Sequence, residues 1–351
     1  MILVAYGTRP EIIKLFPVIR ELRKRRIAHE TLFTGQQTDL YEDVKDLVPR
    51  PDVSFADSFS GRGKHNTLGE SFLKICRASE RLFSRRRFDA VVVQGDTTTA
   101  WALAQMAFYN GVKIAHVEAG LRTFNPANPY PEELNRTLIG HAAEWNFAPT
   151  KRACENLTGC GARNVHNVGN TIVDAVDILR RRRKIPVTRS NEVPVTLHRR
   201  ENHAIMGRLF DELNRVAAGN PDLDLILPIH PNPNVRKHRL RLAAKNIRVI
   251  PPVGYLEMLR MLARARFVIS DSGGIQEECA CLNKKILIVR ETTERPEVIE
   301  MGLGKLVGGK LLPHIDWARS PAGKSRQHPF GNGRAAERIV RILSRPPLNA
   351  K

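Results

Sequence analysis

The sequence VVVQGDTTT at residues 91–99 carries a β-branched apolar run just ahead of Asp96, and KIAHVEAGLR at 113–122 repeats the pattern ahead of Glu118. A further acidic pair follows in PEELNR at 131–136. Ligands of open α/β sheets bind outside the carboxyl ends of the strands. Because carboxylates that lie close together repel one another, structure alone gives little reason to gather them at that edge. We therefore interpret the stretch as a site that moves protons.

Strand and helix patterns alternate on both sides of this stretch, which favours parallel strands joined by right-handed helical crossovers. In the first half we predict strands at 1–5, 30–34, 90–93, 113–117 and 145–148, and helices at 10–25, 68–83 and 97–109. In the second half we predict a helix at 172–182 and strands at 193–197, 224–228, 247–250, 267–270 and 285–289. The predicted fold class is α/β, with two Rossmann-like, doubly wound halves.

The chain has 351 residues, which is too long for one ordinary hydrophobic core. The pattern changes near Gly169, so we place a first domain at 1–168 and a second at 169–330. A Gly-Asn-Gly break precedes a basic amphipathic helix at 334–343, and we treat 331–351 as a C-terminal segment. Because ligands often bind at domain interfaces, we expect a cleft between the two halves.

The charge balance is strongly basic, with 56 Lys and Arg against 36 Asp and Glu and a formal net charge of +20. Such a charge suits nucleic acid, an anionic membrane surface or anionic substrates. The basic runs at 23–26 and 85–87 fall at predicted helix C-termini, where cations are favourable. We therefore expect no nucleic-acid partner and favour anionic substrates.

Two other features of the composition bear on location and metal content. No apolar run is long enough to span a bilayer, so we expect a cytoplasmic protein with no membrane partner. The five cysteines match neither a C-x-x-C pair nor a zinc framework. We predict buried free thiols and no metal.

Two strand-to-helix turns have the chemistry of phosphate binding. GTRPE at 7–11 places a glycine and Arg9 at the start of a helix, with Lys14 in its first turns. SDSGGIQEE at 270–278 offers backbone N–H groups and hydroxyls to a phosphate pair. It lacks the lysine of a P-loop and the spacing of a dinucleotide fold, which disfavours ATP hydrolysis and NAD. A plain capped helix and a glycine-rich turn are the structural alternatives.

Three further segments follow predicted strands of the second half: HRREN at 198–202, HPNPN at 230–234 and RETTERPE at 290–297. A histidine at the carboxyl edge of a sheet can contact a pyrophosphate or transfer a proton, and both alternatives remain open. Together, the phosphate-binding turns, the histidine segments and the acids are typical of a site for a nucleotide sugar. The second half would hold its diphosphate, and the acids of the first half would face the sugar and move protons.

Taken together with VGNT at 168–171, these motifs closely resemble the non-hydrolysing UDP-N-acetylglucosamine 2-epimerases, nearly end to end. The resemblance implies the GT-B fold: two Rossmann-like domains with a cleft between them, and a C-terminal helix that crosses back to the first. It implies interconversion of UDP-GlcNAc and UDP-ManNAc without NAD or any other cofactor, for polysaccharide precursor synthesis. In this reaction the C2 proton and UDP leave, 2-acetamidoglucal forms, and UDP adds back with a proton on the other face.

The resemblance also assigns catalytic roles. It makes Asp96, Glu118 and Glu132 the proton-handling carboxylates and leaves open which of them faces which side of C2. His198 is implied to be catalytic or to contact phosphate.

Substrate-binding roles follow in the same way. Arg136 would lie near the sugar or the diphosphate, and His230, with Gln36 and Arg199, would bind a second, activating UDP-GlcNAc. The residues implied to hold UDP are Arg9, Lys14, Ser272, Gly273, Gly274, Glu278 (at the ribose) and Arg295.

The chain departs from the family pattern at a few positions. Leu197 stands where many members have Gly, Val253 and Met258 differ in the segment beside the uracil, and Asp39 replaces a regulatory Gln. Hydrolysing relatives lack the GLRT pattern at 120–123, which disfavours hydrolysis. The alternatives are a 2-epimerase of a related UDP-acetamido sugar and a GT-B glycosyltransferase. The resemblance also implies a homodimer.

Overall fold

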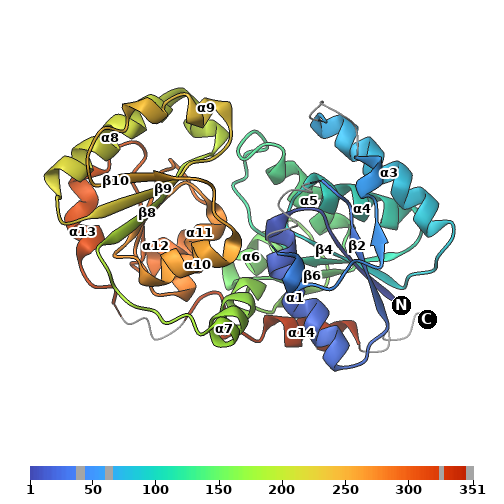
Figure 1. Ribbon diagram of the computed structural model, residues 1–351. Helices are drawn as coiled ribbons and strands as arrows, with labels where there is room; N and C mark the ends of the chain where they lie inside the picture. The colour runs from blue at the N-terminus through green and yellow to red at the C-terminus, as the bar shows by residue number, and fades with distance from the viewer. Residues whose placement is uncertain (37–43, 60–65, 324–327, 345–351) are drawn as a thin grey trace. The chain divides into compact units, whose positions relative to one another are not determined.

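The structure is a computed structural model that describes residues 1–36, 44–59, 66–323 and 328–344, so Asp39 lies outside the described residues. The chain forms two compact units (Figure 1). Unit 1 contains Met1–Asp177 and the chain from Pro329 onward, and unit 2 contains Ile178–His328.

Unit 1 is built on a parallel sheet with strand order β3-β2-β1-β4-β5-β6-β7 among the described residues. The register sets Val4 of β1 beside Val92 of β4, and Gln94 of β4 beside Val117 of β5. These central strands are almost wholly buried, which explains why they read as continuous apolar runs. The strands are β1 Ile2–Tyr6, β2 His29–Phe33, β3 Val53–Ser54, β4 Ala90–Gln94, β5 Lys113–Val117, β6 Trp145–Ala148 and β7 Val165–Asn167.

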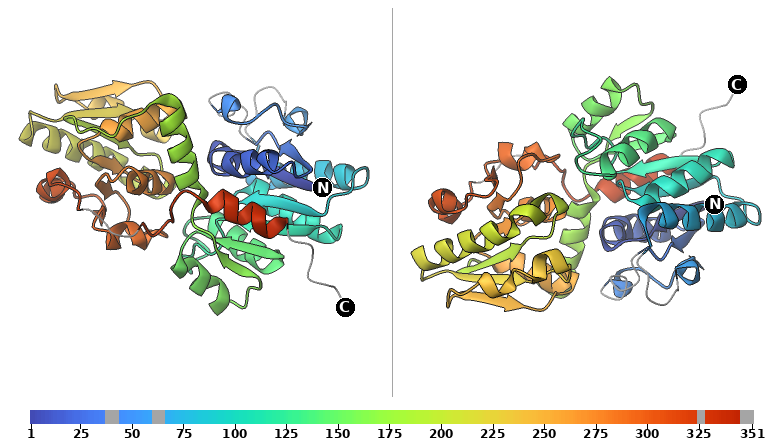
Figure 2. Two further views of the ribbon diagram at one scale, coloured as in Figure 1. Left: turned by 90° about the horizontal axis from the view of Figure 1, so that it is seen from below. Right: turned by 90° about the horizontal axis from the view of Figure 1, so that it is seen from above.

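The helices of unit 1 alternate with these strands. Helix α4 contacts both α3 and α5, and α14 from the end of the chain lies beside α1 (Figures 1 and 2). The helices are α1 Arg9–Lys24, α3 Leu68–Phe83, α4 Thr98–Tyr109, α5 Glu132–Ala142, α6 Lys151–Gly159 and α14 Ala335–Leu343, together with the first part of α7 Thr171–Arg183, which continues into unit 2.

Unit 2 repeats the plan with the order β10-β9-β8-β11-β12-β13, again with all pairs parallel. Its core contains Val193, Phe210 and Phe267, all fully buried. The strands are β8 Glu192–Thr196, β9 Asp224–Pro228, β10 Ile247–Ile250, β11 Val268–Ser270, β12 Ile286–Ile288 and β13 Gly304–Leu306. The helices are α8 Met206–Gly219, α9 Pro233–Arg236, α10 Tyr255–Arg264, α11 Gly273–Cys281, α12 Pro296–Glu300 and α13 Ile315–Arg319.

The end of the chain is fixed to unit 1 by the segment around α7. The carboxylate of Asp174 accepts the N–H groups of Ala335 and Ala336, at 3.1 and 3.0 Å, which have no partner within α14 itself. The Phe330 carbonyl accepts the Asn170 N–H at 2.8 Å. These bonds join the start of α14 to the first part of α7 within unit 1, and the division between the two units falls after Asp177 and before Pro329.

Three strands escaped the sequence analysis: β3, β7 and β13, each only two or three residues long. The cysteines are free thiols as predicted, but only Cys279 is buried. Within the described ranges, no helix is long and apolar enough to cross a membrane.

The cap that Asp174 provides gives a first prediction. Replacing it by Ala should lower the free energy of unfolding by about 1–2 kcal/mol, because two buried N–H groups lose their acceptor. Native-state hydrogen exchange of the α14 amides should become roughly tenfold faster. The exposed Asp46, changed to Ala, is the control and should leave α14 unaffected. Unchanged α14 exchange in Asp174→Ala would contradict this assignment.

Candidate active site

Each sheet has one place where the strand order reverses direction, and the site residues gather there. In unit 1 this place is between β1 and β4, and in unit 2 it is between β8 and β11. The connections that leave such neighbouring strands run to opposite sides, so their carboxyl ends leave room for a ligand. The acids of unit 1 and the histidine and glycine turns of unit 2 lie at these edges.

Glu118 follows β5 and is held by two side chains from neighbouring elements. The ammonium of Lys14, on α1, lies 2.5 Å from its Oε2, and the amide of Gln94, at the end of β4, donates to the same oxygen. Both charged side chains are about 95% buried. Glu118 has a φ of 65°, a backbone conformation that costs energy outside glycine and persists only where the surroundings impose it.

Asp96 follows β4 and is partnered by Arg136 of α5. The Arg136 Nε lies 3.2 Å from Asp96 Oδ2 and 3.5 Å from Glu133 Oε2. Asn135 donates to the Asp96 carbonyl at 2.8 Å and so fixes the turn. The Asp96 side chain stays 28% exposed, while Arg136 is buried. The Asp96 carboxylate is therefore accessible to a ligand, whereas the Arg136 guanidinium that pairs with it is fixed by burial.

Glu132 is the first residue of α5, and its carbonyl accepts the Arg136 Nε at 3.3 Å. The carboxylate of the neighbouring Glu133 has a structural role, because it accepts hydrogen bonds from the backbone N–H groups of Thr123 and Phe124, both at 3.0 Å. The repulsion expected among the acids is relieved, because Glu118 and Asp96 are each matched to a different cation.

Glu11 is a buried acid that the sequence analysis did not single out. Its carboxylate accepts from Gly7 N, Thr8 N, Thr8 Oγ1 and Thr97 Oγ1 at 2.7–3.0 Å. Burial raises the pKa of Glu11 to about 7, although these bonds act in the opposite direction. It joins the turn after β1 to the residue next to Asp96. The T-x-x-E spacing of a capping box was the available signal.

Two further buried groups shape this edge. His116 of β5 donates from Nε2 to the Gly95 carbonyl at 2.7 Å, and burial lowers its pKa to about 4, so the ring is neutral. Gly7 admits no side chain, since an added Cβ would lie 2.2 Å from the hydroxyls of both Thr34 and Thr99. Arg9 begins α1 and is partly exposed. The Gln36 amide oxygen accepts the Thr99 hydroxyl at 2.7 Å.

In unit 2, β11 leads into the N-terminus of α11. Ser272 precedes the helix without its hydroxyl capping it, and a side chain at Gly274 would meet open space. Gly273 is closely covered, because an added Cβ would lie 2.6 Å from the Arg295 guanidinium. This guanidinium therefore lies at the helix N-terminus, where backbone N–H groups favour anions. Glu278, one turn further on, is buried.

Asp271, which the sequence analysis did not assign, anchors the His198 segment. It is fully buried, and its Oδ2 accepts the N–H groups of His198 and Arg199 at 2.9 Å and the Asn202 amide at 3.0 Å. Its Oδ1 lies 3.3 Å from His198 Nδ1. The His198 ring stacks on His230 at a centroid distance of 5.3 Å. This arrangement orients His198 and leaves its ring about one-third exposed.

The last cations of the site form a buried chain of ion pairs. Arg295 Nε lies 2.6 Å from Glu277, and Arg290 lies 2.7 Å from both Glu294 and Glu201. Arg295 also approaches Glu294 at 3.5 Å. The chain fixes the guanidinium groups rigidly beside α11. No cluster of three or more His, Cys, Asp or Glu within the described ranges is arranged to hold a metal ion.

Comparison with known proteins adds independent information. A family model described as UDP-N-acetylglucosamine 2-epimerase matches residues 20–344. The UDP-N-acetylglucosamine 2-epimerase of Campylobacter jejuni is 37% identical, with 97% of each chain covered.

Two solved structures are similar over the whole chain. That of the Neisseria meningitidis UDP-GlcNAc 2-epimerase bound to UDP-GlcNAc has 32% identity and a TM-score of 0.89, covering 97% of this chain and 99% of that one. That of the Methanocaldococcus jannaschii UDP-GlcNAc 2-epimerase, in complex with UDP-GlcNAc and UDP, has 35% identity and a TM-score of 0.82, covering 98% and 99%. The GT-B class predicted from the sequence is confirmed, with two parallel sheets.

The buried Lys14–Glu118 pair gives a second prediction. Lys14→Met should lower the free energy of unfolding by about 3 kcal/mol, because it leaves a buried carboxylate without its cation. A double-mutant cycle with Glu118→Gln should show a coupling energy of about 1–3 kcal/mol by urea denaturation. The exposed Lys151–Glu155 pair, 3.6 Å apart, is the matched control, with coupling below about 0.5 kcal/mol. Equal coupling in the two cycles would refute the pairing.

Glu11 gives a pH prediction. Its raised pKa means that the folded protein binds more protons than the unfolded chain between about pH 4.5 and 7. Stability contributed by this group is therefore lost as the pH rises through that window, by about 3 kcal/mol in all. Glu11→Gln should remove this dependence, and the exposed Glu155→Gln should not. A constant difference between wild type and Glu11→Gln from pH 5 to 7.5 would exclude the raised pKa.

Proposed function

The chain belongs to the UDP-N-acetylglucosamine 2-epimerase family and is an isomerase, and on that premise we propose how its residues carry the reaction. The substrates are UDP-GlcNAc and UDP-ManNAc, which differ only in configuration at C2 of the sugar. The observation that carries the proposal is the carboxylate of Glu118, fixed by Lys14 and Gln94 in a buried position at the carboxyl edge of the unit 1 sheet.

The reaction is an elimination followed by an addition. A base removes the proton from C2 while the C1–O bond to UDP breaks. The electron pair of the C2–H bond forms the new C1–C2 double bond, and the electron pair of the C1–O bond leaves with the diphosphate. The C1–C2 double bond of 2-acetamidoglucal results. UDP then adds back to C1, and an acid delivers a proton to the opposite face of C2. Two carboxyl groups on opposite faces suffice, because one accepts a proton and the other supplies one.

We assign the two proton-transfer roles to the acids of unit 1. Glu118 has a fixed position and a buried cation, which makes it a well-oriented group for transfer at one face. Asp96 is more open and is oriented by Arg136, which suits the second face. Glu132, at the start of α5, is the third member of the set.

We assign the leaving diphosphate to unit 2. The N-terminus of α11 presents backbone N–H groups beside the Arg295 guanidinium, and both stabilise the negative charge that develops on UDP. His198 is oriented by Asp271 and stacked on His230, and in this assignment it donates to a phosphate oxygen. Glu278 accepts the ribose hydroxyls in this assignment.

An NMR time course with a panel of UDP-sugars tests the proposed activity. UDP-GlcNAc should be converted to UDP-ManNAc, with traces of UDP, until the two epimers reach equilibrium. Conversion of a related UDP-acetamido sugar in place of UDP-GlcNAc would reassign the substrate. UDP release that depends on an added acceptor would indicate a glycosyltransferase instead.

The Glu118→Gln variant tests the assignment of the base. It should lower kcat by about 10²–10⁴, because the amide cannot accept the C2 proton. The Kd of UDP, measured by calorimetry, should change by less than about twofold, since the residues that bind the diphosphate lie on unit 2 in our assignment. Glu80→Gln on the exposed face of α3 serves as the control. Wild-type kcat in Glu118→Gln would remove Glu118 from the chemistry.

A further inference from the structure

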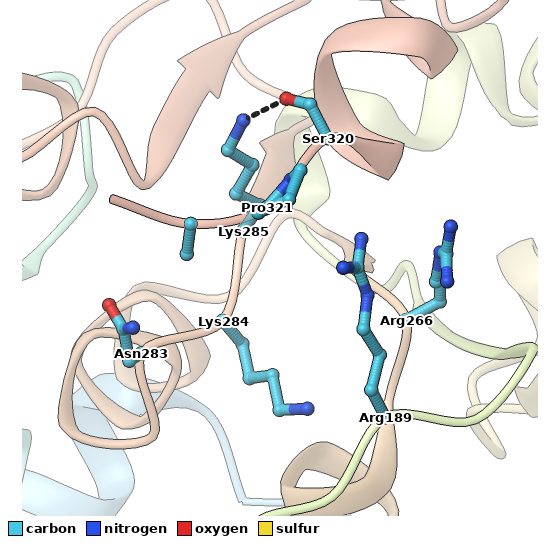
Figure 3. Close-up of a pocket in the computed structure, with 8 residues that line it drawn as sticks. Arg189, Arg266, Asn283, Lys284, Lys285, Ser320 and Pro321 are labelled. Carbon is cyan, nitrogen blue, oxygen red and sulfur yellow. Dashed lines mark hydrogen bonds between the residues drawn. The ribbon is translucent and has the colours of Figure 1, made fainter. Parts of the chain in front are cut away.

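Unit 2 has a second cluster of charge at the amino edge of its sheet, where strands β8, β11 and β12 begin. A pocket of about 220 Å³ opens there (Figure 3). Arg189 precedes β8, Arg266 precedes β11, and Lys284 and Lys285 precede β12. The pocket is lined by Arg189, Arg266, Asn283, Lys284, Lys285, Ser320, Pro321 and Ala322.

The charged side chains in this lining are all cationic, and no carboxylate of the described residues is among them. Figure 3 shows Arg189 and Arg266 on one side of the pocket, with the Lys284 side chain extending from the other side. Arg266 lowers the pKa of Asp222 through its charge, but the Asp222 carboxylate already accepts two hydrogen bonds from Arg319, at 2.6 and 3.1 Å. The pocket therefore carries an excess of positive charge.

Backbone carbonyls and the Ser320 hydroxyl, rather than acids, accept the hydrogen bonds of the two lysines. The ammonium of Lys284 donates to the Ala265 carbonyl at 2.7 Å and to the Thr188 carbonyl, and Lys285 donates to the Trp317 carbonyl at 2.8 Å. Both lysines are 94% buried. Carbonyl oxygens fix the position of an ammonium group and leave its net charge in place.

The neighbours of these cations disfavour their charged forms. Burial lowers the pKa of Lys284 to about 8, and Arg189 acts in the same direction while Cys279 opposes it. Burial also lowers the pKa of Arg189, and Arg266 adds to the effect. In addition, the Arg266 Nε is buried with no hydrogen-bond acceptor among the described residues. An anion at this place would reverse the repulsion and supply the missing acceptor.

The size of the pocket limits what it can take. Its volume of about 220 Å³ corresponds to roughly seven water molecules at ~30 Å³ each. Pockets for drug-sized ligands are commonly about 300–1,000 Å³. A tetrahedral oxyanion fits this volume, which is smaller than that of a site for a drug-sized ligand.

We propose that this pocket binds a small inorganic oxyanion of the phosphate class. Arg189 and Arg266 provide the forked N–H donors that match oxyanion geometry, and Lys284 provides a buried positive charge. The site goes beyond the proposed function, because its residues precede the strands whose carboxyl ends carry the His198 and Ser272 segments. Occupancy ties together the starts of three strands and stabilises unit 2.

Titration of the full chain with inorganic phosphate tests the site. Saturating UDP is present throughout to occupy the nucleotide site, and NaCl keeps the ionic strength constant. Phosphate should raise the melting temperature saturably, by about 2–4 °C. The double variant Arg189→Gln/Arg266→Gln should weaken phosphate binding by at least about tenfold. Arg208→Gln, an exposed arginine of α8 away from the pocket, should bind phosphate like the wild type.

The remaining outcomes decide against the proposal. An equal phosphate effect in the double variant would place the binding elsewhere. An effect no larger than that of NaCl would show that no site exists. Adenosine monophosphate serves as a larger probe with the same phosphoryl group and should not bind, so equal binding by it would overturn the assignment to a free inorganic ion. The double variant should keep its epimerase activity, which separates this test from that of the catalytic assignment.

Discussion

The buried pair of Lys14 and Glu118 is the interaction on which the organisation of unit 1 depends. Taking two charges out of water is costly, and their attraction offsets the cost only when the geometry is good and further hydrogen bonds are made. Gln94 supplies such a bond. The pair thus requires the start of α1 and the ends of β4 and β5 to keep fixed positions. Those are the elements that must be fixed for a carboxylate to meet one carbon from a defined side.

The two units carry groups of opposite electrostatic character at the carboxyl edges of their sheets. Unit 1 collects carboxylates and pairs the two at its strand ends with separate cations, which orient the carboxylates and relieve their mutual repulsion. Unit 2 collects anion-binding groups, and its buried Asp271 serves the backbone of the His198 turn. One edge therefore suits proton transfer, and the other suits a diphosphate leaving group. This division of roles between the two units follows from the charged groups that lie at the carboxyl edge of each sheet.

The sequence predicted the long central elements closely, because their patterns are local. The ranges of α3, β5 and β9 agree with the prediction residue for residue. Strands β3, β7 and β13 were missed because they are short and only partly buried, so that polar residues interrupt their apolar pattern, whereas the equally short β11 and β12 are fully buried. Asp96 and Glu118 were identified because each follows an apolar strand. The partners of these acids were not identified, since Lys14 and Glu118 are 104 residues apart. Asp271 escaped for the same reason, because its donors lie 69 to 73 residues earlier in the chain.

The central step of the proposed mechanism is transfer of the C2 proton to a carboxylate of the protein and from there to solvent. Epimerisation in D₂O, followed by isolation of both UDP-sugars and mass spectrometry and NMR of the ring protons, measures this transfer directly. We predict one deuterium at C2 of the product and none at other ring carbons. Product formed with the original hydrogen retained at C2 and no deuterium gained would contradict it.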